Sequence, residues 1–206
     1  MKKSIITVSR EFGSGGRTIG KTVAQRLGIP YYDKELVKQV ALESGFDPKY
    51  IEEQGEFAPG KTHFAFSFLG RGVPGVMGGM TAADFLWTIQ HNVILDLADK
   101  GPCVIVGRCA DYILRDDPRR LSVFVHAPLD ERVRRAREEY GVQEPNLESF
   151  VLRQDKARAS YYNYFATGKW GQSREYDLCV SSHMGIAAAV ATIKAAALAV
   201  AGGTGA

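Results

Sequence analysis

A glycine-rich segment near the amino terminus combines residue types that bind phosphate. Residues 9–21 read SREFGSGGRTIGK, between an apolar, β-branched run and a helical pattern that Gly28 closes. Unpaired backbone amides at a helix start converge on an anion, and glycine lets an oxygen approach the backbone closely. The segment therefore predicts a phosphate-binding loop with these ligands: Arg10, Gly13, Ser14, Gly15, Gly16, Arg17, Thr18 and Lys21.

The segment departs from the pattern G-x-x-x-x-G-K-[ST], which ends in a lysine and a metal-binding hydroxyl. Two alignments are possible. In the first, Gly16 stands at the lysine position and Arg17 at the hydroxyl position. In the second, Arg17 replaces the lysine and Thr18 offers its hydroxyl to Mg²⁺. We favour the second because it keeps a cation and a hydroxyl in the site, with Arg10 and Lys21 as further cations; the alternative is a glycine turn that only joins a strand to a helix.

A second group of positive charges lies in the second half of the chain. Six of the fifteen arginines fall between residues 132 and 158, although the formal net charge of the whole chain is only +3. This local excess indicates an anionic ligand. The alternative, for about half of the arginines in this stretch, is a solvated helix face that pairs with nearby glutamates.

Composition excludes several classes of protein. The 206 residues are 45% hydrophobic and 24% charged, near the average of soluble domains, and no apolar run is long enough to cross a bilayer. The net charge is too small to indicate nucleic-acid binding. Three cysteines without paired spacing suit a reducing compartment, and residues 1–13 lack the pattern of a secretory signal. We expect a cytoplasmic protein that binds neither nucleic acid nor a membrane.

Strand and helix patterns alternate along the chain, which predicts an α/β fold with a parallel sheet and helices on both faces. Continuous apolar runs predict buried strands, and 3.6-residue periodicity predicts the helices. The strands are expected at residues 4–9, 103–107, 121–127 and 176–182, with a short fifth one at 29–33. The helices are expected at residues 34–44, 81–100, 129–140, 146 to about 165, and 185–201. Residues 55–80 alternate glycine and aromatics without a period, which is typical of a functional loop or lid.

Four segments together resemble the cytidylate kinase-like family, relatives of the nucleoside monophosphate kinases. They are the segment from Ile6 to Val37, VIVGRCADYIL, VFVHAPLDERVRRA and RQDKARASYYNYF, and the resemblance runs from Ile5 to about Ile193. It implies a three-layer α/β/α P-loop kinase fold with a parallel five-stranded sheet and a helical lid. It also implies a single domain over residues 1–206, with an acceptor-binding region at about 33–100 and a lid at about 130–175. In this lid, Arg132, Arg134 and Arg135 are expected to lie over the phosphate groups.

The resemblance assigns an acceptor site to residues in the middle of the chain. Cytidylate kinases carry a G-R-D motif after the third strand, whose arginine binds the acceptor phosphate and whose aspartate reads cytosine. Gly107 and Arg108 match this motif, but Cys109 stands at the aspartate position, where Asp111 could partly replace the missing carboxylate.

A later D-x-x-R motif of the family is matched by Asp155 and Arg158, expected near the ribose and near the base and phosphate of the acceptor. Arg153 lies close to the position of a further family arginine that this chain lacks. Asp33 follows a predicted strand and is a candidate for the metal or the acceptor; capping the helix that follows is the equally weighted alternative.

The activity that this resemblance implies is the transfer of a phosphoryl group from ATP, with Mg²⁺, to a nucleoside monophosphate such as CMP or dCMP. Such transfer depends on positioning and on charge neutralisation, which suits an arginine-rich site without a dedicated base. The residues expected to be catalytic are Arg17, Arg108, Asp155 and Arg158. The partners expected are nucleotide substrates, and a homodimer is possible. The alternatives are a non-catalytic nucleotide- or phosphate-binding module and a kinase for another small acceptor.

Overall fold

The computed structural model describes residues 5–45 and 82–202, so the glycine-aromatic segment at 55–80 lies outside the described residues. Five strands form one sheet in the order β2-β3-β1-β4-β5, and every pairing is parallel. The strands are β1 (Ile5–Arg10), β2 (Tyr31–Tyr32), β3 (Cys103–Val106), β4 (Arg120–His126) and β5 (Leu178–Ser181). The predicted parallel five-stranded α/β fold is therefore confirmed.

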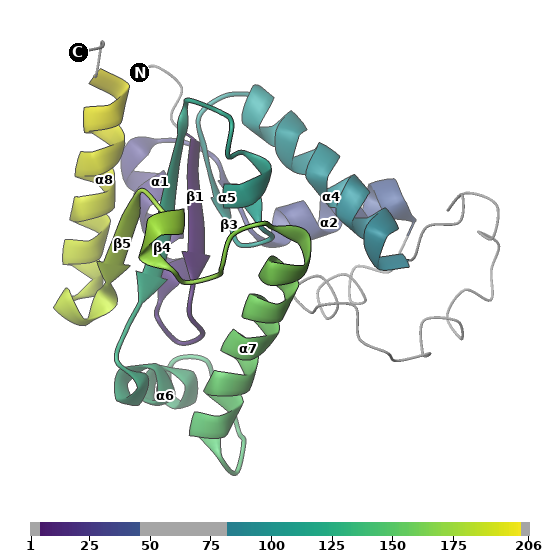
Figure 1. Ribbon diagram of the computed structural model, residues 1–206. Helices are drawn as coiled ribbons and strands as arrows, with labels where there is room; N and C mark the ends of the chain where they lie inside the picture. The colour runs from purple at the N-terminus through teal and green to yellow at the C-terminus, as the bar shows by residue number, and fades with distance from the viewer. Residues whose placement is uncertain (1–4, 46–81, 203–206) are drawn as a thin grey trace.

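Helices cover both faces of the sheet (Figure 1). The helices are α1 (Gly16–Leu27), α2 (Lys34–Ser44), α4 (Ala82–Asp99), α5 (Ala110–Ile113), α6 (Leu129–Glu138), α7 (Leu147–Phe165) and α8 (Ile186–Gly202). Two short 3₁₀ turns, η2 (Ser173–Glu175) and η3 (Ser182–Met184), flank β5. None of the helices in the described part of the chain is long and apolar enough to cross a membrane.

Two cores lie on opposite sides of the central strand. Because successive side chains of a strand point to opposite faces, Ile5 packs with α2, α4 and α5, whereas Ile6 packs with α1 and α8. All residues of β1 are buried, as expected for a strand that is covered on both faces. This burial explains why its sequence is a continuous apolar run instead of an alternating one.

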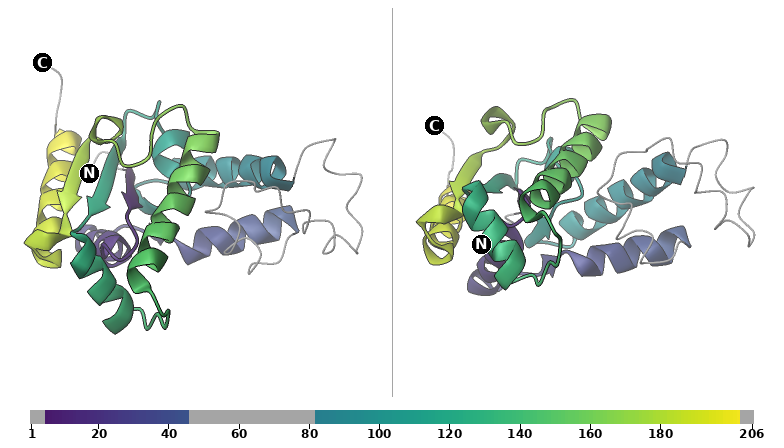
Figure 2. Two further views of the ribbon diagram at one scale, coloured as in Figure 1. Left: turned by 60° about the horizontal axis from the view of Figure 1, so that its bottom comes forward. Right: turned by 90° about the horizontal axis from the view of Figure 1, so that it is seen from below.

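The carboxyl ends of the parallel strands point toward α6 and α7 (Figure 1). These two helices lie side by side beyond the strand ends, and α2 and α4 form a second pair that extends away from the sheet (Figure 2). Ligands of open α/β sheets bind at the carboxyl ends of the strands. The loops that follow β1, β2 and β3 therefore enclose the region in which to look for a site.

Candidate functional site

The loop between β1 and α1 has the backbone geometry of an anion-binding turn. Gly13 and Gly15 have φ values of 79° and 77°, a left-handed conformation that favours glycine. Gly15 is the N-cap of α1 and has no side chain that could bond the helix amides. No acidic residue lies in the first turn of this helix. The amides at the start of α1 are therefore suited to an external anion.

Three predicted loop residues, Arg17, Thr18 and Lys21, lie exposed on α1. The Arg17 side chain is 52% exposed, and its Nε lies 3.1 Å from Oδ2 of Asp33 at the end of β2. Tyr31 donates its hydroxyl to the Arg17 carbonyl, and burial together with the Asp33 carboxylate raises the pKa of Tyr31, so the phenol stays protonated. Asp33 makes no capping hydrogen bond to α2. Its carboxylate holds Arg17 at the edge of the loop.

Arg10, the last residue of β1, is buried beneath the loop at 5% exposure. A Cβ atom added to Gly16 would lie 2.6 Å from Cβ of Arg10 and 3.0 Å from its Cγ. The stem of Arg10 therefore fills the volume that a side chain at position 16 would need. This contact explains the glycine at the position where the first alignment requires a lysine.

Glu11, Arg132 and Asp155 form a group of charges that we call the loop clasp. The Glu11 Oε2 atom accepts from the Ala127 amide at 3.1 Å and lies 3.4 Å from Arg132 Nε. The Asp155 carboxylate accepts from the Phe12 amide at 2.7 Å and forms a close ion pair with Arg132 Nη1. The clasp ties α6 and α7 to the phosphate loop, so both Arg132 and Asp155 lie against the loop backbone.

The remaining arginines of α6 divide between buried and exposed positions. Arg135 is buried and donates from Nη1 to the Gly13 carbonyl at 2.5 Å. Arg134 is exposed and pairs with Glu138 at 2.9 Å, and Arg137 is exposed as well. Of the three predicted lid arginines, Arg132 and Arg135 lie at the loop and Arg134 does not.

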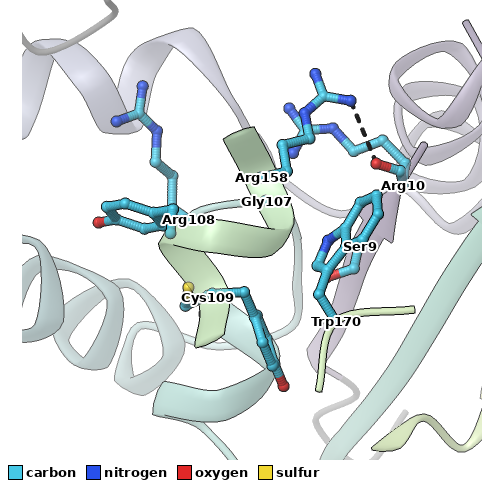
Figure 3. Close-up of a pocket in the computed structure, with 9 residues that line it drawn as sticks. Ser9, Arg10, Gly107, Arg108, Cys109, Arg158 and Trp170 are labelled. Carbon is cyan, nitrogen blue, oxygen red and sulfur yellow. Dashed lines mark hydrogen bonds between the residues drawn. The ribbon is translucent and has the colours of Figure 1, made fainter. Parts of the chain in front are cut away.

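A pocket beside the loop collects three arginines, Arg10, Arg108 and Arg158. Figure 3 shows the guanidinium groups of Arg108 and Arg158 extending toward the same side, with the Arg158 bond to the Arg10 carbonyl, 3.3 Å long, as a dashed line. The cavity measures about 20 Å³, which has room for a water molecule but not for a nucleotide. The other residues that line it are Ser9, Gly107, Cys109, Tyr161, Tyr162 and Trp170. The predicted acceptor ligand Arg153 lies apart from this pocket, exposed and 3.7 Å from Glu144.

The turn after β3 is backbone-strained where it meets the pocket. Gly107, Arg108 and Cys109 have consecutive positive φ values of 74°, 58° and 54°. The left-handed conformation costs about 1–2 kcal/mol for each residue other than glycine. Strain of this kind persists only where surrounding contacts hold it, and it clusters at functional sites.

Asp111 lies beneath the pocket at 2% exposure. It accepts a hydrogen bond from the Ser9 hydroxyl at 3.2 Å. Burial raises the pKa of the Asp111 carboxyl, and hydrogen bonds from Tyr162 and Ser9 oppose that shift only in part. Ser9 and Tyr162 line the pocket while Asp111 does not, so Asp111 can act on a bound molecule through these two side chains.

Three residues of this region carry no sequence signal. Glu11 and Phe12 lie inside the glycine-rich segment, but the phosphate-loop pattern gives neither side chain a role: in the favoured alignment Glu11 falls where the pattern has its first glycine, and Phe12 falls on an unrestricted position. Gln90 lies inside an ordinary helical pattern. Phe12 packs edge-on against Tyr140 and Phe150, which adds an apolar contact between the loop and the two helices above it. Gln90 bonds to the Arg108 carbonyl.

Comparisons with known proteins agree with this geometry. The family model described as the cytidylate kinase-like family matches residues 5–184. An uncharacterized protein from Eubacterium ventriosum has a similar crystal structure, with 29% identity, a TM-score of 0.69, and coverage of 95% of this chain and 98% of its own. No curated protein matches the sequence significantly.

Two further solved structures share the fold at lower identity. A shikimate kinase from Bacteroides thetaiotaomicron is 16% identical with a TM-score of 0.55, covering 94% of this chain and 97% of its own. A gluconokinase from Sinorhizobium meliloti is 18% identical with a TM-score of 0.57, covering 96% of this chain and 93% of its own. These neighbours show the P-loop kinase fold. Because the family model matches most of the length of this chain, the chain belongs to the cytidylate kinase-like family.

Proposed function

We propose that the protein is an ATP-dependent nucleoside monophosphate kinase and that CMP and dCMP are its first candidate acceptors. The observation that carries this proposal is the glycine loop at the start of α1, whose N-cap residue has no side chain to bond the helix amides, with the arginine pocket directly beside it. A phosphoryl-transfer enzyme needs two anion sites next to each other, because donor and acceptor must lie in line. The family and the kinase fold support a phosphotransferase; the choice of acceptor is our proposal.

The loop is the proposed donor site. Amides at the start of α1 would bind the terminal phosphates of ATP, and Thr18 would bind Mg²⁺. The described residues contain no cluster of three metal-ligating side chains. That finding is compatible with Mg²⁺, which takes most of its ligands from phosphate and water and needs only one or two from the protein.

Two arginines are candidates for the cation that replaces the loop lysine. Arg17 follows the helix start directly but is held outward by Asp33. Arg10 fills the volume beside Gly16 and lines the arginine pocket. These contacts favour Arg10 as the cation between donor and acceptor, with Arg17 at the outer edge of the donor phosphates.

The arginine pocket is the proposed acceptor site, with Arg108 and Arg158 on the acceptor phosphate. In this proposal α7 moves away from the strand ends to admit the acceptor, because the cavity as it stands has room only for a water molecule. Arg158, Tyr161 and Tyr162 all belong to α7, so one movement would open the pocket on one side. In this proposal α6 and α7 act as the lid, and closure excludes water from the transferred group.

The sulfur at position 109 favours one further candidate, a kinase for a different small anionic acceptor. Cys109 lines the pocket where the family motif has a cytosine-reading aspartate, and a thiol is a much weaker hydrogen-bond partner than a carboxylate. A module that binds nucleotide without transferring phosphate is the remaining alternative.

The decisive assay incubates purified protein with MgATP and one acceptor at a time: CMP, dCMP, UMP, dUMP, AMP, GMP and, for the alternative, shikimate and gluconate. ADP release and the phosphorylated product are measured together. We expect turnover with at least one nucleoside monophosphate above the acceptor-free background. Turnover with only a non-nucleotide acceptor would replace the proposal by its alternative, and ATP binding without transfer to any acceptor would refute it.

A further inference from the structure

Gln90 is a buried amide that connects two walls of the arginine pocket. It lies in the middle of α4 and is 3% exposed. Its Nε2 atom donates to the Arg108 carbonyl at 3.0 Å and to the Tyr161 hydroxyl at 3.1 Å. Both N–H groups of this nitrogen are therefore used, one on the turn after β3 and one on α7.

The first of these bonds falls on the strained turn. Arg108 and Cys109 both hold left-handed φ values. A small rotation of the backbone at Arg108 would swing its long side chain through a wide arc, so the guanidinium position depends on whatever fixes the carbonyl. A buried carbonyl that lost its donor would favour a rotation that recovers one.

The second bond connects the same amide to the element that carries Arg158. Tyr161 and Arg158 are three residues apart on α7 and therefore lie on the same side of the helix. Stacking of Trp87 on Phe165, with ring centroids 4.3 Å apart, joins α4 to α7 one turn from Gln90 and one turn from Tyr161. Gln90 is thus a polar member of an α4–α7 contact that lies beside both pocket arginines.

We propose that Gln90 is a positioning residue for the acceptor site: it holds Arg108 in its strained conformation and sets α7 so that Arg108 and Arg158 can bind one anion together. This inference takes the identity of the ligand, a phosphoryl acceptor, from the proposed function. The two hydrogen bonds of Gln90 do not depend on that function. Gln90 touches no reacting atom in this account. Its effect passes through the two arginines.

The test replaces Gln90 by an isosteric side chain that cannot donate. Gln90→Met should raise the KM for the acceptor about tenfold, with the KM for ATP changed by less than about twofold, because a single buried hydrogen bond to the acceptor turn is lost. Thr88→Ala is the matched control on the same helix: Thr88 is exposed, and its hydroxyl donates to the Asp84 carbonyl one turn earlier. We expect both constants to stay at the wild-type value in this control.

Relief of the strain supplies a rescue that a general packing defect would not show. Glycine adopts positive φ without cost, so Cys109→Gly should relieve part of the strain in the turn. Gln90→Met should therefore raise the acceptor KM by a smaller factor in the Cys109→Gly background than in the wild-type background. A crystal structure of Gln90→Met gives a readout that is independent of activity, since we expect φ of Arg108 to leave the left-handed region. If Gln90→Met does not fold, Tyr161→Phe removes one of the two acceptors of Gln90 and should raise the acceptor KM by a smaller factor.

The outcomes separate this inference from the proposed function. Failure of the wild-type protein to phosphorylate any acceptor would refute the function, and the structure of the variant would still decide the role of Gln90. The inference would be overturned if the Gln90→Met protein kept the left-handed φ of Arg108. If the protein turns over an acceptor, an unchanged acceptor KM in this variant would overturn it as well. An equal rise in the KM for ATP and in the KM for the acceptor would also overturn it.

Discussion

Loss of the Arg132 side chain should destabilise the protein by more than the loss of an exposed arginine would. Arg132 is 5% exposed, and the two carboxylates that it pairs with, Glu11 and Asp155, are only partly exposed. In Arg132→Met both carboxylates lose their cation while the apolar volume is kept. Removing one partner of a buried ion pair costs about 3–5 kcal/mol. We take the lower end, about 3 kcal/mol, because water can still reach the two carboxylates.

Thermal unfolding of Arg132→Met measures this cost directly. For a chain of this size each kcal/mol shifts Tm by about 2–4 °C, so Tm should fall by roughly 6–12 °C. Arg134→Met is the matched control on the same helix. Its exposed pair with Glu138 is worth about 0.3–0.5 kcal/mol, or at most about 2 °C.

A double-mutant cycle isolates the interaction within the clasp. Asp155→Asn should cost less in the Arg132→Met background than in the wild-type protein, because the ion pair is already lost. Additive losses, or a Tm for Arg132→Met within about 2 °C of the Arg134→Met value, would refute the clasp as a stabilising element.

Two other predictions concern titratable groups. Burial raises the pKa of Asp111 from its ordinary value of 3.8, so its contribution to stability is complete below the unfolded-state pKa and is lost as the pH rises through the folded-state pKa. In urea titrations, Asp111→Asn should therefore gain stability relative to wild type as the pH rises from about 4 to about 8, and a constant difference would contradict this. Burial also raises the pKa of the Cys103 thiol to about 11, and Cys109 is buried, whereas Cys179 is exposed. Burial raises the pKa of Cys179 as well, but because its side chain is exposed, iodoacetamide at neutral pH should modify Cys179 before the two buried thiols. Native-state modification of Cys109 at the rate of Cys179 would show that the arginine pocket opens without ligand.

The sequence predicted the sheet well because its three central strands, β3, β1 and β4, are buried on both faces and so appear as largely apolar runs. Gly13 and Gly15 were recognisable because a left-handed turn before a helix requires glycine. The roles of the arginines were harder to predict. Periodicity placed Arg132, Arg134 and Arg135 on one helix, but only the contacts of α6 with the loop separate the buried pair from the exposed member.

Contacts between distant segments could not be inferred from local pattern. Glu11 meets Arg132 across more than a hundred residues, and Gln90 reaches the turn after β3 through a side chain that nothing in its helix distinguishes. The packing of Arg10 against Gly16 is another such contact. It explains the glycine at position 16, whereas the sequence favoured the second loop alignment only because that alignment keeps a cation and a hydroxyl in the site.

Calorimetric titration with a non-hydrolysable ATP analogue and Mg²⁺ tests the central claim, that loop amides and an arginine bind the donor phosphates. The account predicts saturable binding to the wild-type protein that weakens at least about tenfold, or about 1.4 kcal/mol, in Arg10→Gln, with a smaller loss in Arg17→Gln. Absence of binding at millimolar nucleotide, or wild-type affinity in both variants while they remain folded, would contradict it.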